Sequence, residues 1–413
     1  MKNKQFFIPV LVGLIAGQIF AEGDRPFTIV NTVRVGYSDN IDHRSDGEGS
    51  AFVRDMLDLS FRAALSDRTD LIFKSRFDYR SDKEEDNKFY PNLYAVLTHS
   101  VSSRLTLELA DKFRSGEKTS GSADGRYDYW ENTVSLTPNY ILTPKDRVLL
   151  PVSYTTRVHD DKIESLDVDV TQAGITWLRE LSPQRTQVGV NLRARQVNYP
   201  NQYSSYTDPN DGTVYDFDDD ESGYDALEMT AELRHTFNPE WQGNVEAGVT
   251  YVMPDKPGWN ETPTNLPSVT THKMADNDNS LEPFVRVGLA YEPSPRTRFT
   301  VDLEQSYQES NDDKYAGVNS SEIRFGAQHE FTGKITGKAT ARFLDSDYEA
   351  SDARTTGVGD DTQERVDLDL RLQYKLNRIN FLELGYQYRE KSYDSSDRDW
   401  EENMVDVGWR VEL

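Results

Sequence analysis

The stretch PFVRVGLAYEPSPRTRFTVDLEQSY, residues 283–307, contains the pattern that repeats along the chain. From Pro283 to Tyr291 every second residue is apolar or aromatic, and the residues between them are mostly charged, small or hydroxylic. After the compact turn 293–296 the alternation resumes as far as Tyr307, with Gln305 as the one polar residue in the apolar row. Because successive side chains point to opposite faces of a strand, the stretch predicts an antiparallel hairpin with one apolar and one polar face.

The apolar face of such a hairpin can be covered in two ways. In a soluble β-sandwich it packs against a second sheet, whereas in an outer-membrane barrel it faces lipid and the polar face lines a wet lumen. The remaining features of the sequence decide between these two folds.

The composition limits the classes of protein that the chain can belong to. Its 413 residues carry a net charge of −25, and the mean hydropathy is −0.73. A membrane barrel is compatible with these values, because only alternate residues of a spanning strand must be apolar. Beyond the N-terminal stretch no apolar run approaches about 18 residues, which excludes a helical membrane protein. The acidic balance argues against a nucleic-acid partner, and the absence of cysteine excludes disulfides and thiolate metal sites.

The N-terminus has the features of an export signal. A short basic segment, Met1–Lys4, precedes the apolar stretch Phe6–Phe20, and Ala21 offers a small residue for cleavage before Glu22. A membrane anchor is the alternative, and the short length of the stretch disfavours it. We expect a signal peptide over residues 1–21 and one domain, the barrel, over residues 22–413.

Alternation and turn residues together predict eighteen strands. They span Phe27–Tyr37, Phe52–Leu65, Leu71–Tyr79, Tyr90–Thr98, Leu105–Phe113, Tyr129–Tyr140, Arg147–Val158, Leu166–Leu178, Gln187–Val197, Leu227–Phe237, Asn244–Met253, Glu282–Tyr291, Arg298–Tyr307, Glu322–Phe331, Thr336–Leu344, Arg365–Tyr374, Phe381–Arg389 and Glu402–Leu413. Their apolar sets run over roughly nine to eleven residues, the length of a tilted membrane strand. Aromatic residues gather at strand ends, where barrel proteins place rings at the headgroup level; they include Tyr37, Tyr79, Phe113, Tyr140, Phe237, Tyr251, Tyr291, Tyr307, Phe331, Tyr374, Tyr388 and Trp409.

The connections between the predicted strands alternate in length. Those after even-numbered strands are brief, such as Thr143–Asp146 and Leu376–Arg378. Those after odd-numbered strands are longer and polar, and the largest are Tyr199–Asp225 and Pro254–Ser280. A sandwich has no reason to sort its loops in this way, whereas a barrel inserted from one side has short periplasmic turns and long external loops. The pattern therefore favours the barrel.

The first and last predicted strands resemble those of a known family. The segment VRVGYSDNI (Val33–Ile41) opens the chain with an aromatic residue followed by Asp-Asn, and NMVDVGWRV (Asn403–Val411) closes it with Gly-aromatic-Arg. Both are similar to the outer-membrane β-barrel porin family associated with exopolysaccharide loci, the porin-2-like barrels. The resemblance implies an outer-membrane channel, with polysaccharide export as one candidate role.

The polar faces of the predicted strands carry many charged residues. A barrel of about eighteen strands is too wide for strand side chains to fill, so these charges would meet water. They would either form a charge filter or pair across neighbouring strands and keep the lumen wet. The candidate pore-lining residues are Lys74, Arg76, Arg193, Arg195, Arg286, Asp302, Arg324, Arg342, Asp369 and Arg371.

The long loops are rich in carboxylates. Asp208–Gly212 and Asp216–Glu221 lie in one loop, and Asp276–Asn279 lies in the next. Such clusters can bind Ca²⁺, or meet lipopolysaccharide through divalent cations, but none has the spacing of an EF-hand. A solvated, mutually repelling loop is the simpler interpretation, and we assign no metal site.

Catalysis has little support in the sequence. The chain contains no Gly-x-Ser-x-Gly, His-Glu-x-x-His or phosphate-binding glycine loop. The six histidines are His43, His99, His159, His235, His272 and His329, and most are predicted near strand ends. We therefore expect no enzyme activity, no catalytic residue and no cofactor.

Taken together, the sequence predicts an all-β protein, a transmembrane antiparallel up-and-down barrel of about eighteen strands in the cell outer membrane. Its partners would be outer-membrane lipid, lipopolysaccharide and a hydrophilic solute or polysaccharide, with a homo-oligomer left open. The expected function is a porin-like channel for diffusion or export of hydrophilic solutes. The alternatives are a barrel whose loops bind polysaccharide or lipopolysaccharide without an open pore, and a soluble secreted β-sandwich or lyase.

Overall fold

The computed structural model describes residues 26–41, 43–83, 87–119, 126–159, 167–200, 203–207, 214–218, 223–254, 279–309, 315–350, 361–394 and 399–413. The signal peptide predicted for residues 1–21 lies outside these ranges, as do residues 208–212, 219–221 and 276–278 of the acidic loop tracts. No helix in the described ranges has the length and apolar character needed to cross a membrane.

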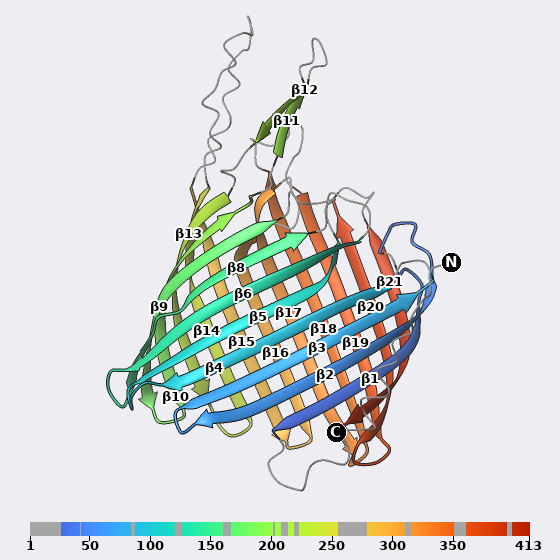
Figure 1. Ribbon diagram of the computed structural model, residues 1–413, viewed down its shortest axis with the longest axis horizontal. Coiled ribbons are helices and arrows are strands. Elements are labelled where there is room, and N and C mark those ends of the chain that lie inside the picture. The colour runs from blue at the N-terminus through green and yellow to red at the C-terminus, as the bar shows by residue number, and fades with distance from the viewer. Residues whose placement is uncertain are drawn as a thin grey trace, which may run out of the picture.

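The described strands form one closed antiparallel wall (Figure 1). They are β1 (Phe27–Ser38), β2 (Ser50–Ser66), β3 (Thr69–Asp82), β4 (Lys88–Ser100), β5 (Leu105–Thr119), β6 (Arg126–Ile141), β7 (Asp146–Leu149), β8 (Val152–His159), β9 (Val168–Ser182), β10 (Thr186–Asn198), β13 (Gly223–Thr236), β14 (Trp241–Pro254), β15 (Ser280–Ser294), β16 (Thr297–Glu309), β17 (Tyr315–Thr332), β18 (Ile335–Ala350), β19 (Asp361–Lys375), β20 (Asn380–Tyr393) and β21 (Trp400–Glu412). Since β7 and β8 both pair with β6 and β9, they make one wall strand with a break, and the wall has eighteen strands. β1 pairs with β2 and with β21, which closes the barrel. The predicted eighteen-stranded antiparallel barrel is confirmed.

The break between β7 and β8 has a local cause. Pro151 has no N–H to donate to the ladder, so regular pairing stops there. The Leu150 N–H still donates to Pro138 O at 3.0 Å, and the Gly174 N–H donates to Pro151 O at 2.9 Å. The wall therefore stays hydrogen-bonded across the break.

The connections alternate in length, as the sequence predicts. At one end, called the short-turn end below, strands are joined by turns such as 295–296 and 333–334. At the opposite, long-loop end the connections include 199–222 and 255–279. Outer-membrane barrels place short turns in the periplasm and long loops outside, which assigns the long-loop end to the exterior.

Several strands continue further toward the long-loop end than the apolar pattern predicts. β17 begins at Tyr315 rather than Glu322, and β5 ends at Thr119 rather than Phe113. Most of the extra residues are polar, and cross-strand hydrogen bonds alone extend the strands there, beyond the apolar pattern. The connection predicted as one loop over Tyr199–Asp225 also contains a hairpin, β11 (Tyr203–Thr207) and β12 (Val214–Asp218), which stands above the rim in Figure 1.

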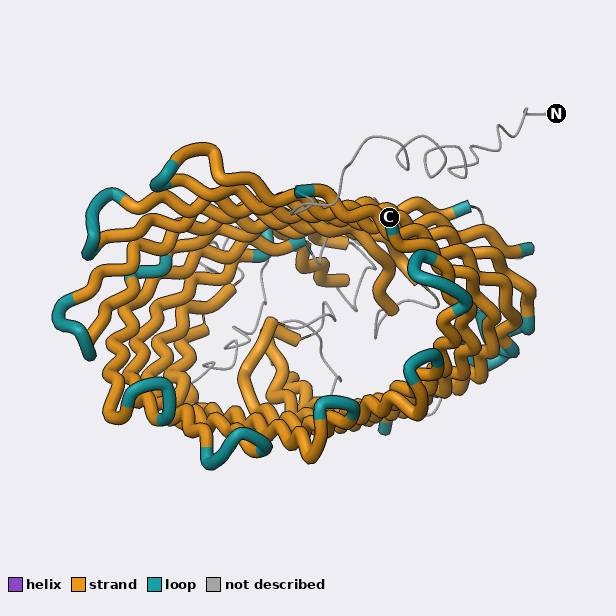
Figure 2. The backbone as a smooth tube through the Cα atoms, turned by 90° about the horizontal axis from the view of Figure 1, so that it is seen from below, coloured by secondary structure: helices purple, strands orange, loops and turns teal. Residues whose placement is uncertain are grey.

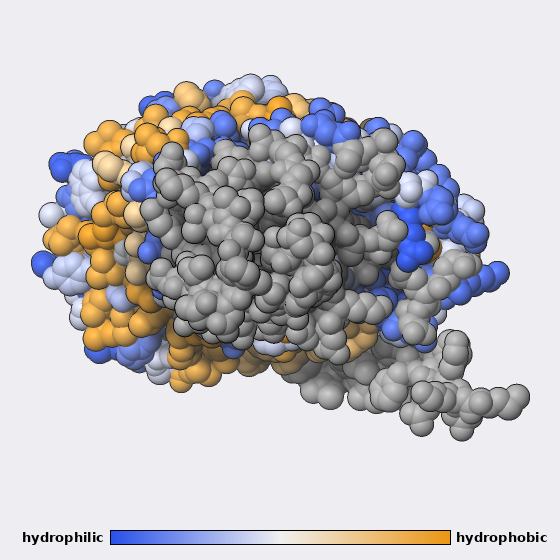
Figure 3. All heavy atoms as spheres, turned by 90° about the horizontal axis from the view of Figure 1, so that it is seen from above, coloured by the Kyte–Doolittle hydropathy of each residue, from blue (hydrophilic) through white to orange (hydrophobic). Residues whose placement is uncertain are grey.

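The outer face of the wall carries an apolar belt. Leu303 and Leu370 expose 37% and 41% of their surface, so no second protein layer covers them. In the view from above, apolar residues lie on the outer flank of the wall (Figure 3). A closed barrel with an exposed apolar belt is the architecture of an outer-membrane protein, and it excludes the sandwich alternative.

The inner face of the wall is mostly polar. Asn191 donates to Glu246 at 2.9 Å and to Thr230 at 3.1 Å, and all three side chains are buried. Figure 2, which looks along the barrel from below, shows strand segments inside the ring of the wall. The candidate site is the part of the lumen that these segments border.

Candidate functional site: the lumen and its constriction

All ten candidate pore-lining residues lie on the inner face of the wall. Asp302, for example, stands between the belt residues Val301 and Leu303 and is opposite Arg324 in the ladder. The ten are Lys74 and Arg76 on β3, Arg193 and Arg195 on β10, Arg286 on β15, Asp302 on β16, Arg324 on β17, Arg342 on β18, and Asp369 and Arg371 on β19. Inner-face position alone does not make a residue part of the narrowest section.

Most of these charges pair with carboxylates of nearby strands. The Arg193 guanidinium donates to Glu228 at 2.9 Å. Further pairs are Arg76–Asp58 at 2.7 Å, Arg286–Glu304 at 3.0 Å, Arg342–Glu322 at 2.8 Å and Arg371–Asp406 at 3.1 Å. Cross-strand pairing, one of the two arrangements considered for these charges, is therefore present along the wall.

Arg195 has a different role from the other candidates. Its guanidinium donates to the backbone oxygen of Tyr307 at 3.3 Å and lies 5.5 Å from the centre of the Tyr224 ring. Tyr307 belongs to β16, which is separated from β10 by β13, β14 and β15 in the wall. The contact is therefore possible only if the end of β16 crosses the lumen side of those strands.

The end of the β16–β17 hairpin folds into the barrel. We call residues 305–309 and 315–321 the β16–β17 tip. Tyr307 and Asn319 occupy the strand face that points to lipid lower in the hairpin. In the tip, however, Tyr307 packs edge-on against Tyr224 at 5.4 Å, and Asn319 donates to Glu282 on the inner face of β15. The prediction that Tyr307 belongs to the outer aromatic girdle is therefore wrong, because the strand bends inward above the belt.

The β5–β6 hairpin also bends inward at its end. Asp128 of β6 accepts a hydrogen bond from Tyr90 at 2.9 Å and one from Lys88 at 3.2 Å. Ser115 of β5 donates to the backbone oxygen of Pro91 at 3.0 Å. Because Tyr90 and Lys88 are on the inner face of β4, the end of the β5–β6 hairpin lies over the lumen side of β4.

The first long connection, between β1 and β2, contributes a third inward segment. The Asn40 side chain donates to the backbone oxygen of Glu401 at 2.9 Å. The His43 ring stacks on Trp400 with centroids 4.1 Å apart, and its Nε2 lies 3.0 Å from Glu402. Asn40 belongs to Val33–Ile41, and Trp400 and Glu402 lie just before Asn403–Val411, so both segments that carry the family resemblance are next to these contacts.

The inward segments border a cavity of about 860 Å³ in the lumen. Its lining includes His43, Glu117 of the β5–β6 hairpin, and Gln308 of the β16–β17 tip. Nine basic side chains face four carboxylates in this lining; the basic residues are Arg54, Arg80, Arg114, Arg157, Arg324, Arg342, Arg365, Arg389 and Lys391. A basic cavity thus lies inside a chain whose net charge is −25.

Only Arg324 and Arg342 of the ten candidates line this cavity. The other six arginines and Lys391 were missed, because they lie toward the long-loop ends of strands that are far apart in the sequence. Arg54 and Arg365, for example, come from β2 and β19. The sequence could have indicated them, because each lies on the polar face of its strand, where every second residue points into the lumen.

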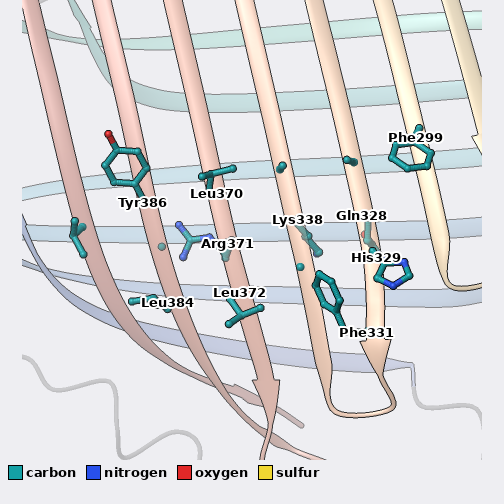
Figure 4. A pocket seen from close by; sticks show the side chains of 15 residues that line it. Phe299, Gln328, His329, Phe331, Lys338, Leu370, Arg371, Leu372, Leu384 and Tyr386 are labelled. Carbon is teal, nitrogen blue, oxygen red and sulfur yellow. The ribbon is translucent and has the colours of Figure 1, made fainter.

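A second hollow, of about 480 Å³, lies on the outer face of the barrel (Figure 4). Small residues at Ala327, Gly337 and Ala339 leave a depression, and Phe299 and Leu370 stand at its sides. Since the hollow is within the apolar belt, it belongs to the lipid-facing surface and not to the lumen.

Among the described residues, the histidines show no hydrolase geometry. Ser38 donates to Glu402 at 2.6 Å, and Glu402 also contacts His43, so the carboxylate lies between the serine and the imidazole. In a serine hydrolase the imidazole lies between the serine and the acid. At the short-turn end, His99, His235 and His329 each contact a threonine of the neighbouring strand. Within the described ranges, no group of three or more metal-ligating side chains could hold a metal ion.

Comparison with known proteins agrees with this architecture. Residues 283–413 match a family model described as "Putative beta-barrel porin 2". No curated protein matches the sequence.

Among solved structures, the siderophore receptor PiuA from Acinetobacter baumannii aligns with a TM-score of 0.51 at 9% identity, over 95% of this chain and 82% of that one. Pseudomonas aeruginosa OccK1 (OpdK) aligns with a TM-score of 0.48 at 13% identity, over 94% of this chain and 99% of that one. Pseudomonas aeruginosa OccK2 (OpdF) gives 0.49 at 10% identity, over 94% and 98%. The match to PiuA, over 95% of this chain, shows the barrel fold.

The closed wall, the lipid-facing belt and the family match over residues 283–413 together identify a porin-like barrel of the outer membrane. The resemblance that the first and last strands suggested is confirmed over this C-terminal segment.

Proposed function

We propose that the barrel is a passive diffusion channel for hydrophilic solutes and that it prefers anions. The observation that carries the proposal is the cavity lining, where nine basic side chains face four carboxylates. These side chains come from both halves of the wall, for example Arg54 of β2 and Arg324 of β17. A solute in the cavity therefore faces more basic than acidic side chains, and Glu131, Asp367 and Glu402 behind the lining pair with several of these arginines.

Guanidinium groups suit this role. Each offers several N–H donors in a planar fork that matches a carboxylate or phosphate. The Arg54 and Arg324 side chains are 38% and 60% exposed, although each also contacts a carboxylate. Exposed donors can exchange water for a passing anion, and charge at a constriction selects ions by sign.

The proposed solutes are small carboxylated or phosphorylated molecules, acidic sugars among them. Acidic exopolysaccharide is the polymeric candidate, and it comes from the family resemblance rather than from the cavity. Among the candidate pore-lining residues, we propose Arg324 and Arg342 as part of the selective section, Arg195 as a contact of the inward end of β16, and the remaining seven as the charged wall of the wider bore.

A barrel that binds surface polysaccharide without conducting is the second candidate. The three inward segments favour it, because they occupy part of the bore at the long-loop end. The channel requires a continuous path past them, whereas the binding barrel does not.

Planar-bilayer recording of the purified full chain separates the two candidates. A channel of the proposed kind gives unitary current steps, and its reversal potential in a KCl gradient has the sign of chloride preference. A cation preference would contradict the proposed selectivity. Pure protein that inserts without current steps, but retains acidic polysaccharide in a pull-down, would support the binding barrel instead.

A further inference from the structure

We propose that the β16–β17 tip is a docked constriction, that Tyr307 holds it in place, and that it sets the largest solute able to pass. This inference rests on the channel function proposed above. Tyr307 is a positioning residue in this proposal, because it acts through the position of the tip.

The tip docks on an apolar patch of the inner wall. Six side chains at the long-loop ends of β9, β10, β13 and β14 form a buried cluster: Val168, Val197, Tyr199, Tyr224, Ala226 and Val252. Tyr307 packs against this cluster. Apolar side chains on a water-facing wall gain stability only where something covers them. The patch is therefore the receptor surface for the tip.

Polar contacts fix the orientation of the docked tip. The Arg195 guanidinium donates to Tyr307 O at 3.3 Å. Asn319, across the ladder from Tyr307, donates to Glu282, which is buried on β15. The two contacts hold both strands of the tip against the wall.

The opposite face of the tip borders the cavity. Gln308, Val318 and Ser320 line it, together with the arginines of the facing wall. One face of the tip is thus attached to the wall, and the other reduces the cross-section available to a solute. Releasing the tip would widen the bore while the strands of the belt stay paired.

The first experiment compares Tyr307→Ala with Tyr251→Ala. Tyr251 is an exposed tyrosine on the outer face of β14, so it controls for the loss of an aromatic ring at the long-loop end. We expect Tyr307→Ala to raise the unitary conductance and to admit larger neutral sugars in liposome swelling. Tyr251→Ala should match the wild type in both measurements, and the heat-dependent shift in electrophoretic mobility checks that each variant is folded.

A second experiment measures docking without any current. The chain has no cysteine, so a single Val252→Cys reports the accessibility of the patch. Val252 is 1% exposed. A membrane-impermeant maleimide should label this cysteine slowly in the wild-type background and rapidly when Tyr307→Ala is added. Gln308→Cys, on the exposed face of the tip, should be labelled rapidly in both backgrounds.

The outcomes separate this inference from the proposed function. Equal labelling of Val252→Cys with and without Tyr307 would overturn the docked tip, whether or not the barrel conducts. Faster labelling with unchanged conductance and unchanged size limit would show that the tip docks but does not constrict, and would also overturn the inference. A wild type that never conducts would instead contradict the channel function, and the labelling result would still decide whether the tip docks.

A cross-link gives a rescue test. Glu282→Cys and Asn319→Cys replace two residues that are hydrogen-bonded in the docked state. A short, cleavable cross-linker that reacts with thiols joins the two cysteines in the Tyr307→Ala background, and the conductance should then return to the wild-type value. Cleaving the cross-link should raise the conductance again.

Discussion

Asn403 in the last strand bonds twice to Asp39, which directly follows the first strand. Its backbone N–H donates to one carboxylate oxygen at 2.6 Å, and its side-chain amide donates to the other at 3.0 Å. Both residues belong to the segments that carry the family resemblance. Their contact lies at the long-loop end of the β1–β21 seam, where the barrel closes on itself.

Asp39→Ala should weaken this seam. Hydrogen bonds to a charged partner contribute about 1.5–3 kcal/mol, and this site is exposed, so we expect a loss of about 1 kcal/mol in the free energy of unfolding. Urea titration of the barrel in lipid vesicles measures the loss. Asp46→Ala, in the connection that follows, is the control for removing one negative charge. Equal midpoints for the two variants would show that the Asp39–Asn403 contact does not stabilise the seam.

The cavity arginines should set the ion preference. We expect the double variant Arg324→Gln/Arg342→Gln to conduct with a smaller preference for chloride, because two positive charges leave the lining. The reversal potential in a KCl gradient measures the change. Arg68→Gln, in the exposed turn after β2, is the matched control and should leave the potential unchanged. A double variant that retains the full wild-type potential would remove these two residues from the selective section.

Glu131 should affect stability and selectivity in opposite directions. It accepts hydrogen bonds from Arg114 at 2.7 Å and from Arg157 at 2.7 Å, and it is buried. In Glu131→Gln the two guanidinium groups lose their shared counter-charge, which should cost on the order of 3 kcal/mol of stability. The same change adds net positive charge beside the cavity, so chloride preference should rise. Urea titration and reversal potential measure the two effects. A variant that is both less stable and less anion-selective would contradict the proposal that the arginines paired with Glu131 contribute to anion preference.

Adjacent residues of β16 test which side of the wall faces lipid. Leu303→Arg places a charge in the apolar belt and should destabilise folding into vesicles by about 2–4 kcal/mol. Asp302→Arg places the same side chain in the lumen, where water can solvate it, and should cost much less. Folding titrations of the two variants under identical conditions give the comparison. Similar losses would mean that Leu303 does not face lipid.

The anion preference should weaken as salt rises. The Debye length falls from about 10 Å at 0.1 M to about 3 Å at 1 M ionic strength, so exposed guanidinium groups act over a shorter range. Reversal potentials measured at a constant concentration ratio, but with different absolute concentrations, give the dependence. A preference that stays constant over this range would point to direct binding of the anion rather than to the field of the lining.

The strands and their order could be predicted from local pattern. Val301 and Leu303 alternate with Asp302 and Glu304, and this alternation reports directly which side chains face lipid. Short and long connections alternate because successive crossings of the membrane end alternately at the periplasmic and the external side. Every strand must place apolar side chains toward lipid, so the residues of each strand alone indicate which of its faces points outward.

The lumen could not be predicted in this way. Tyr307 continues the apolar row of its strand, yet it packs on the inner wall, because no lipid holds the strand in line above the belt and a distant patch around Tyr224 covers it instead. The cavity likewise brings together Arg54 of β2 and Arg342 of β18, which are separated in the wall by β19, β20, β21 and β1. By itself the sequence determined the barrel, its strand number and its lipid-facing residues, since these follow from a period of two. Only the tertiary structure decided which ends fold inward and which charges meet, because those contacts join residues whose separation in the chain carries no local signal.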